Sequence, residues 1–314
     1  MARAHGARAQ MALAFETTYG TPPAGGFTKV PFAPGMTLGT EQPLLENELL
    51  GFGRDPLAPI KDAVTSDGDV VVPIDAENWG FWLKAAFGAP TTTGVGPYTH
   101  EFRSGAVALP SMAIERGLPE VPLYTMFQGC VLDRLQWDIA RSGLLTATAS
   151  LIAQGETSAP TSQAGTLAEN TLARFGSFHG SVARDGTALG NVVSASISYA
   201  NNLDRVETIR ADGLIDGADP GIAALTGQIV VRFADTTLLD AAINGTASEI
   251  TVAYSALATG ETFEIVAHSV FLPRPRISVS GPEGIQVTFD WQAAQDPVLG
   301  RMCTATLVND VAAY

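Results

Sequence analysis

The stretch SDGDVVVPIDAENWGFWLKAAFGAP, residues 66–90, joins a strand pattern directly to a helix pattern. Val70, Val72 and Ile74 alternate with their neighbours, and alternate residues of a strand point to the same face. From Trp79 to Phe87 the large apolar residues recur at helical spacing, and the glycine that follows is a common helix end. The stretch therefore predicts a core-facing strand and then a short helix that packs its aromatic side chains.

A second stretch, LTGQIVVRFADTTLLDAAINGTA at 225–247, repeats this plan. When Gly227 is aligned with Gly68, the three core-facing positions of the first strand fall on Ile229, Val231 and Phe233. The residues after this strand again have the spacing of an amphipathic helix, and a glycine again follows them. The chain therefore contains two copies of one strand–helix unit.

A longer pair of segments supports the repeat. VLDRLQWDIARSGLLTATASLI at 131–152 aligns without a gap with FLPRPRISVSGPEGIQVTFDWQ at 271–292, so that Trp137 meets Ile277. Apolar residues alternate with Thr, Ser, Gln and Asp along the later part of both segments, which is typical of a strand with one buried and one solvent-facing side. Each segment predicts a hairpin, and together they indicate a tandem duplication.

The duplication defines the domain organisation that we expect. The fold class is mainly β, with two tandem antiparallel β-sandwich or barrel domains, each with a flanking α-helix, and long loops. Residues 1–25 resemble an irregular N-terminal arm, 26–158 form the first domain and 159–314 the second, with a linker at 155–165. Two acidic segments, 39–67 and 201–226, are longer than most loops of compact domains, which suggests that they have a function.

Composition excludes some classes of function. Among 314 residues, 18 Lys and Arg stand against 32 Asp and Glu, so the chain lacks the basic surface that binds nucleic acid. The two cysteines, Cys130 and Cys303, are far apart in sequence, which fits a reducing compartment. No apolar run approaches the length of about 18 residues that predicts a membrane span. We therefore expect a globular protein that folds in cytoplasm.

No motif for catalysis or for a bound group emerges. The four histidines are not spaced as zinc ligands, and no glycine-rich phosphate-binding motif is present. The run DGLIDGADPG at 212–221 lacks the alternating ligands and the final glutamate of a calcium loop, so it predicts a turn. We expect no enzyme activity, no catalytic residue, no metal site and no cofactor.

Several segments, taken in chain order, resemble the tail tube proteins of long-tailed, siphophage-like bacteriophages. They are FETTYGTPP, LLGFGRDP, DGDVVVPIDAENWGFWLKAAFG, ISYANNLD and LTGQIVVRFAD, and the resemblance covers residues 14–295. That family is related to the tube protein of type VI secretion. The resemblance implies two packed β-sheets with a flanking helix, in rings of six domains that stack into a DNA-conducting channel. Single-domain tube proteins are shorter than this chain, which would supply two positions of each ring.

The resemblance also implies the assembly and its partners. Three chains would form a homotrimeric, pseudo-hexameric ring, and the rings would stack into the major tail tube of the virion after assembly in the bacterial host cytoplasm. Further partners would be the tape measure, terminator and distal tail proteins. Viral DNA would pass through during ejection without specific binding, and no membrane would be involved. The two acidic loops would lie between rings or subunits, and the N-terminal arm would order on assembly.

A DNA channel must not hold phosphates, so its wall should be polar or acidic. We expect the solvent-facing side of the predicted hairpins to line it, although Arg134, Arg274 and Arg276 share that side and would pair with acids of a neighbour. The lumen-facing candidates are Asp138, Thr146, Thr148, Ser150, Gln286, Thr288 and Asp290. The candidate packing residues are Trp79, Trp82, Phe87, Trp137, Phe233, Phe289 and Trp291.

Two alternatives remain open at this stage. The chain could be another tail component, a terminator or a distal tail protein, which caps or closes a tube rather than building it. It could also be a two-domain β-sandwich adhesin or carbohydrate-binding module, which would expose aromatic residues in a groove. The expectation of no enzyme activity would be contradicted by saturable turnover that a single Asp or His substitution abolishes.

Overall fold

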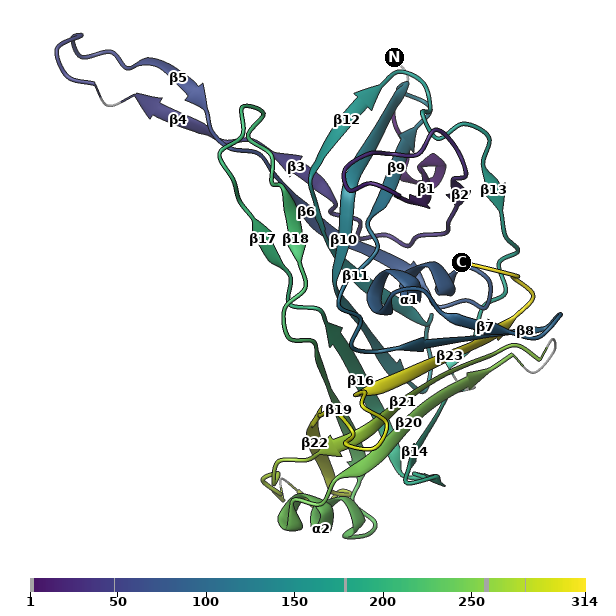
Figure 1. Cartoon of the computed structure of the whole chain (residues 1–314). Coiled ribbons are helices and arrows are strands. Elements are labelled where there is room, and N and C mark those ends of the chain that lie inside the picture. The colour runs from purple at the N-terminus through teal and green to yellow at the C-terminus, as the bar shows by residue number, and fades with distance from the viewer. Residues whose placement is uncertain (1–2, 48, 178–179, 257–259, 280) are drawn as a thin grey trace.

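The computed structural model describes residues 3–47, 49–177, 180–256, 260–279 and 281–314. Its fold is mainly β, as predicted, with the short helices α1 (Trp79–Phe87) and α2 (Thr237–Asn244) and the 3-10 turn η1 (Gly6–Arg8) (Figure 1). Neither helix of this described part is long and apolar enough to cross a membrane.

A long antiparallel sheet, here called the long sheet, runs through both halves of the chain. Strand pairing fixes its order, and every pair of neighbours is antiparallel. The order is β3 (Gly39–Glu41), β6 (Thr65–Pro73), β11 (Thr146–Ala153), β10 (Leu123–Ala140), β16 (Val192–Ala200), β19 (Ala224–Arg232) and β22 (Gln286–Ala293). The first four strands come from the first half of the sequence and the last three from the second, so β10 and β16 join the halves.

A smaller sheet in the first half shares β10 with the long sheet. Residues 123–130 of β10 pair with neighbours in this smaller sheet, whereas the residues from Val131 onward pair with β11 and β16. The other strands of this sheet are β1 (Gln10–Phe15), β2 (Thr28–Lys29), β9 (Met112–Leu118), β12 (Gly155–Ala159) and β13 (Ala168–Glu169).

The corresponding sheet of the second half contains two strands of the first half. Its central strand β21 (Thr262–Phe271) pairs with β20 (Ser248–Ser255) and β23 (Cys303–Asn309), and β8 (Tyr98–Arg103) pairs with β23. The outer strands are β7 (Thr91–Thr93), β14 (Gly180–Arg184) and β15 (Thr187–Ala188). The halves are therefore interleaved rather than separate along the chain.

The internal repeat is visible in the pairing register. β6 and β11 place Val70 opposite Ala149, and β19 and β22 place Ile229 opposite Phe289. These are the residues that the alignment of the two halves makes equivalent. A one-residue slip would turn every side chain to the other face, so equal register shows that the two halves bury the same positions.

The second predicted hairpin is wrong in its first strand. Residues 272–279 are not a strand, whereas the equivalent residues of the first half belong to β10. Ile277 is 37% exposed and Val279 73%, although their counterparts Trp137 and Ile139 are buried. The periodicity is that of a strand, but this segment, which lies between β21 and β22 in the chain, contains two prolines, which have no backbone donor.

Two further segments are more ordered than the sequence indicates. The expected irregular N-terminal arm contains β1, which pairs with β9 along its whole length and buries Met11 and Leu13. The expected linker begins with β12, which pairs with β10. β1 buries four consecutive residues and β12 is mostly exposed, so neither shows the alternation that identifies a half-buried strand.

The two long acidic loops fold as projecting hairpins. The first carries β4 (Leu44–Asn47) and β5 (Leu57–Lys61), and the second β17 (Asp204–Val206) and β18 (Gly217–Asp219). Figure 1 shows both hairpins on the same side of the body, with β4 and β5 reaching furthest from it.

Aromatic side chains fill the core between the sheets. The ring of Trp79, at the start of α1, meets Trp137 at 5.9 Å and Phe263 at 5.8 Å, edge to face in both cases. Such aromatic pairs contribute about 0.5–1.5 kcal/mol beyond the area that they bury. α1 is therefore held by residues from both halves of the chain.

Candidate functional surface: a polar sheet face and two projecting hairpins

The solvent-facing side of the long sheet, here called the polar face, is lined by small polar side chains. Opposite residues of antiparallel neighbours point to the same face. One row across four strands therefore consists of Asp138, Ser196, Gln228 and Asp290. Trp137 lies between Gln136 and Asp138 in the chain and points the other way, into the core.

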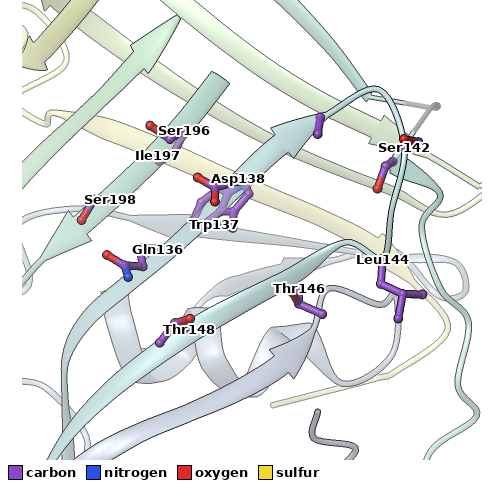
Figure 2. Close-up of a pocket in the computed structure, with 12 residues that line it drawn as sticks. Gln136, Trp137, Asp138, Ser142, Leu144, Thr146, Thr148, Ser196, Ile197 and Ser198 are labelled. Atoms are coloured by element: carbon purple, nitrogen blue, oxygen red, sulfur yellow. The ribbon is translucent and has the colours of Figure 1, made fainter. Parts of the chain in front are cut away.

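A shallow hollow of about 440 Å³ lies on the polar face where the two halves meet (Figure 2). Gln136 and Asp138 reach it from β10, Thr146 and Thr148 from β11, and Ser196 and Ser198 from β16. Hydroxyl and amide groups of this kind bind water well and carry no net charge. The hollow therefore has the character of a wetted wall rather than of an apolar ligand pocket.

The structure brings the seven lumen-facing candidates onto one continuous face. Four come from the first half and three from the second, and the β10–β16 pairing makes their strands part of the same sheet. They are Asp138, Thr146, Thr148, Ser150, Gln286, Thr288 and Asp290, all of them exposed or half-buried.

Neutral donors on adjacent strands hold two of the acids on the polar face. Ser150 Oγ donates to Asp69 Oδ1 at 2.6 Å, and Gln228 Nε2 donates to Asp290 Oδ1 at 2.9 Å. Hydrogen bonds of this kind fix a carboxylate without cancelling its charge. The polar face thus combines a few fixed negative charges with many uncharged groups.

The arginines expected on this face divide into two groups. Arg134 is exposed on the polar face of β10, as its place in the strand requires. Arg274 and Arg276 are exposed as well, but they belong to the irregular segment 272–279 and are not placed on the sheet. Their predicted position on the same face was wrong for this chain by itself, because the strand that would position them is missing.

The candidate packing residues are buried or nearly so. Trp79, Trp82, Phe87 and Trp137 lie in the core of the first half. In the second half Phe289 and Trp291 are buried, and Phe233 is half-buried against the same core. The described part of the chain shows no groove lined by exposed aromatic residues of this set.

The first hairpin carries exposed apolar side chains that the sequence analysis did not single out. Leu50 is 94% exposed at its tip, and Phe52 and Ile60 are exposed as well. The apolar pairs in LLENELLGF could have indicated such a surface, but the sequence pattern identified this segment only as a long acidic loop with a function. Contiguous exposed apolar residues commonly belong to an interaction surface.

The second hairpin is fixed to the body, and it exposes Ile209 among mainly polar residues. Arg205 forms an ion pair with Asp67 of β6 at its base. Near its tip Arg210 contacts Asp212 and Asp216, and the hydrogen bond from Arg210 lowers the pKa of Asp212 to about 2. The first hairpin thus exposes several apolar side chains, whereas the second exposes mainly polar ones together with Ile209.

The reactive side chains have structural surroundings. Cys130 and Cys303 are buried, and burial raises the pKa of both thiols. The imidazole of His100 lies between Thr92 Oγ1 at 2.8 Å and the backbone oxygen of Val311 at 2.8 Å. Within the described residues no three His, Cys, Asp or Glu side chains come together as a metal site.

These features define a mainly β protein with an extended polar sheet face. Residues 6–293 match the family described as phage tail tube protein, so the chain belongs to that family. Membership assigns it a structural role in the tail tube and a place in the virion tail, where it assembles with copies of itself and with other tail proteins. No curated protein matches the chain.

Among solved structures, one similar chain belongs to the anti-feeding prophage baseplate, determined by cryo-EM with 6-fold symmetrisation. The match has 12% sequence identity and a TM-score of 0.33, and it covers 51% of this chain and 97% of that chain.

Proposed function

We propose that this chain is the major tail tube protein, and that three copies form a ring with six equivalent positions. The observation that carries the proposal is the repeat itself, since both halves contribute strands of equal register to one long sheet. A contact that repeats under rotation closes into a ring. Within the chain that contact is the β10–β16 pairing, and between chains it would recur at the ends of the sheet.

The polar face would line the channel. DNA binding requires cationic groups that neutralise phosphates, and its strength falls steeply with salt. A wall of hydroxyl, amide and carboxylate groups offers few such contacts, and its fixed acids repel phosphates over roughly 8 Å in physiological salt. Viral DNA would then pass during ejection without specific binding. The seven candidates from Asp138 to Asp290 are the residues that we assign to this role.

The projecting hairpins would make the contacts between stacked rings. The first hairpin exposes apolar residues far from the body, which costs free energy in water and is relieved when another molecule covers them. A neighbouring ring would supply that cover. The second hairpin, which is anchored through Arg205, would support the same junction.

The remaining parts of the proposal concern partners and chemistry. The tape measure protein would occupy the channel before ejection, and the terminator and distal tail proteins would bind the two ends of the tube. Assembly would take place in the bacterial host cytoplasm, without a membrane. The chain would act as a structural protein that needs no cofactor and catalyses no reaction.

Electron microscopy of the purified protein tests this function. We expect stacked rings with three-fold symmetry and a central channel. Single rings that never stack, but that bind the ends of tubes made by another protein, would instead indicate a terminator or distal tail protein. Monomers that bind to a glycan array would indicate an adhesin or carbohydrate-binding module.

A further inference from the structure

The two ends of the long sheet are incomplete in a complementary way. At one end β3 pairs only with β6 and is three residues long. At the other end β22 pairs with β21 through Gln292 and Ala293 alone, and residues 272–279, which follow β21 in the chain, are not a strand. Six steps between strands separate these two ends, and among the described residues the two ends do not pair with each other.

The middle of the same sheet shows how such ends fit together. There, β10 lies between β11 and β16, with Gln136 opposite Ser198 and Asp138 opposite Ser196. By the repeat, β10 from Val131 onward corresponds to the segment that starts at Phe271. The end strands are therefore second copies of strands that already pair in the middle.

The counterpart of β16 is the segment that ends in β3. β16 pairs with β19 so that Tyr199 is opposite Leu225, and β3 pairs with β6 so that Thr40 is opposite Ser66. Ser66 and Leu225 precede the aligned glycines of β6 and β19 by the same number of residues. Thr40 thus corresponds to Tyr199, and Leu38 to the buried Ile197.

We propose that residues 276–279 become a strand on assembly, held between β22 of their own chain and residues 36–39 of the next copy of the chain. The register of the β10–β16 pair then places Arg276 opposite Gly39, Ile277 opposite Leu38 and Ser278 opposite Thr37. This inference rests on the proposed ring and specifies its contact residue by residue.

Exposed apolar side chains favour this pairing. Ile277 and Val279 would turn toward the core in the places that Trp137 and Ile139 occupy in the middle of the sheet, and both are exposed in the single chain. In α2, Ile243 follows Leu239-Asp240-Ala241-Ala242 as Phe87 of α1 follows Leu83-Lys84-Ala85-Ala86. Ile243 is 50% exposed, whereas the ring of Phe87 packs on that of Tyr199 of β16, with 4.4 Å between the centroids. The next copy would cover Ile243 with the residues that correspond to β16.

The same register explains two charged residues and two prolines. Arg274 would lie opposite Glu41 of the next copy, both being exposed in the single chain, which gives the arginine an acidic neighbour. Pro273 and Pro275 have no backbone donor, so the strand that this register predicts begins after them, at Arg276. Prolines next to a sheet edge also limit unwanted edge-to-edge association.

Disulfide trapping tests the register. In the variant Arg276→Cys with Gly39→Cys, the two thiols would face each other across the contact, and an added side chain at Gly39 meets no backbone atom closer than 3.6 Å. The control is Ser278→Cys with Glu41→Cys, whose positions would be offset by about 14 Å along the strands. Disulfides need Cβ atoms within about 4.5 Å, so only the first pair can close. The buried Cys130 and Cys303 are present in both variants.

We expect oxidised tubes of the matched variant to give covalent dimers and closed trimers on non-reducing gels, and tubes of the control to give monomers. Cross-links in the control but not in the matched pair would overturn the register. Tubes that form normally with no cross-link in the matched pair would overturn the contact itself. If the unmodified chain forms no rings in electron microscopy, the tube assignment fails first, which is a different outcome.

A second pair of variants separates assembly from folding. Ile277→Asp places a charge on the side of the new strand that faces the core, whereas Ser278→Asp places it on the polar face. Both residues are exposed in the single chain, so both variants should fold and melt like the unmodified protein. We expect Ile277→Asp to remain monomeric and Ser278→Asp to assemble. Equal assembly of the two variants would contradict the proposed strand.

Discussion

Gly68 and Gly227 occupy equivalent places in the two halves, and each allows two backbone segments to approach closely. A Cβ atom on Gly68 would lie 2.6 Å from the oxygen of Thr37, and one on Gly227 would lie 2.2 Å from the oxygen of Ser196. Thr37 and Ser196 are themselves equivalent in the repeat. The duplication has thus preserved a contact that only glycine permits.

We predict that Gly68→Ala and Gly227→Ala each lower the free energy of unfolding by about 1–3 kcal/mol, the usual cost of overpacking. The matched control is Gly190→Ala, because an added Cβ there meets no atom within 4 Å. Thermal denaturation of the three variants measures the effect. Equal melting temperatures for all three would show that the backbone moves apart at no cost.

Asp75 is a fully buried acid at the entrance to α1. Its Oδ1 accepts hydrogen bonds from the backbone amides of Glu77 and Asn78 at 3.0 and 2.8 Å. Burial raises the pKa of this carboxyl above its ordinary value, and the hydrogen bonds from Asn78 oppose that rise. The folded protein therefore holds this proton more tightly than the unfolded chain does.

The Asp75 carboxyl has its ordinary pKa in the unfolded chain and a raised pKa in the folded protein. As the pH rises from the first value through the second, the unfolded chain releases the proton first, so the free energy of unfolding should fall. Asp75→Asn keeps an oxygen acceptor and removes the charge. We predict that the melting temperature of Asp75→Asn minus that of the unmodified protein is higher at pH 7 than at pH 4. The exposed Asp55→Asn serves as the control. A relative melting temperature that is the same at both pH values would contradict the raised pKa.

The first hairpin, β4 and β5, presents apolar residues where most hairpins of a soluble monomer are polar. Leu50→Ser with Phe52→Ser should leave folding unchanged, since both side chains are exposed. If this hairpin joins rings, the double variant should give single rings in place of long tubes. Electron microscopy and sedimentation measure the change. Full-length tubes from the double variant would place the contact between rings elsewhere.

Local sequence patterns predicted the strands and helices that bury a regular face. β6, β19, α1 and α2 followed from the spacing of their apolar residues, and β11 and β22 followed from alternation. The same alternation failed at residues 272–279, which are not a strand in the single chain and contain two prolines. It missed β1 and the two hairpins, whose pairing depends on turns and partners more than on a hydrophobic period.

The arrangement of the whole molecule was less accessible. The sequence showed a duplication and suggested two successive domains, but β8 of the first half pairs with β23 of the second. Nothing periodic in either strand identifies a partner some 200 residues away, since alternation only says which face is buried. The polar face was easier to predict, because solvent-facing residues alternate with core residues along the same strands.

The position of the polar face relative to the channel gives the last prediction. Asp138 and Asp290 lie in one row on that face, so Asp138→Arg with Asp290→Arg would replace two negative charges per chain by positive ones. Arginine side chains release counterions from DNA, and the resulting affinity falls steeply with salt. We expect tubes of this variant to retain short duplex DNA inside the channel at low salt and to release it as salt rises.

Tubes of the matched neutral variant, Asp138→Asn with Asp290→Asn, should retain none. Cryo-EM density distinguishes DNA within the channel from DNA on the outside, and DNA bound only to the outer wall would show that the polar face does not line the lumen.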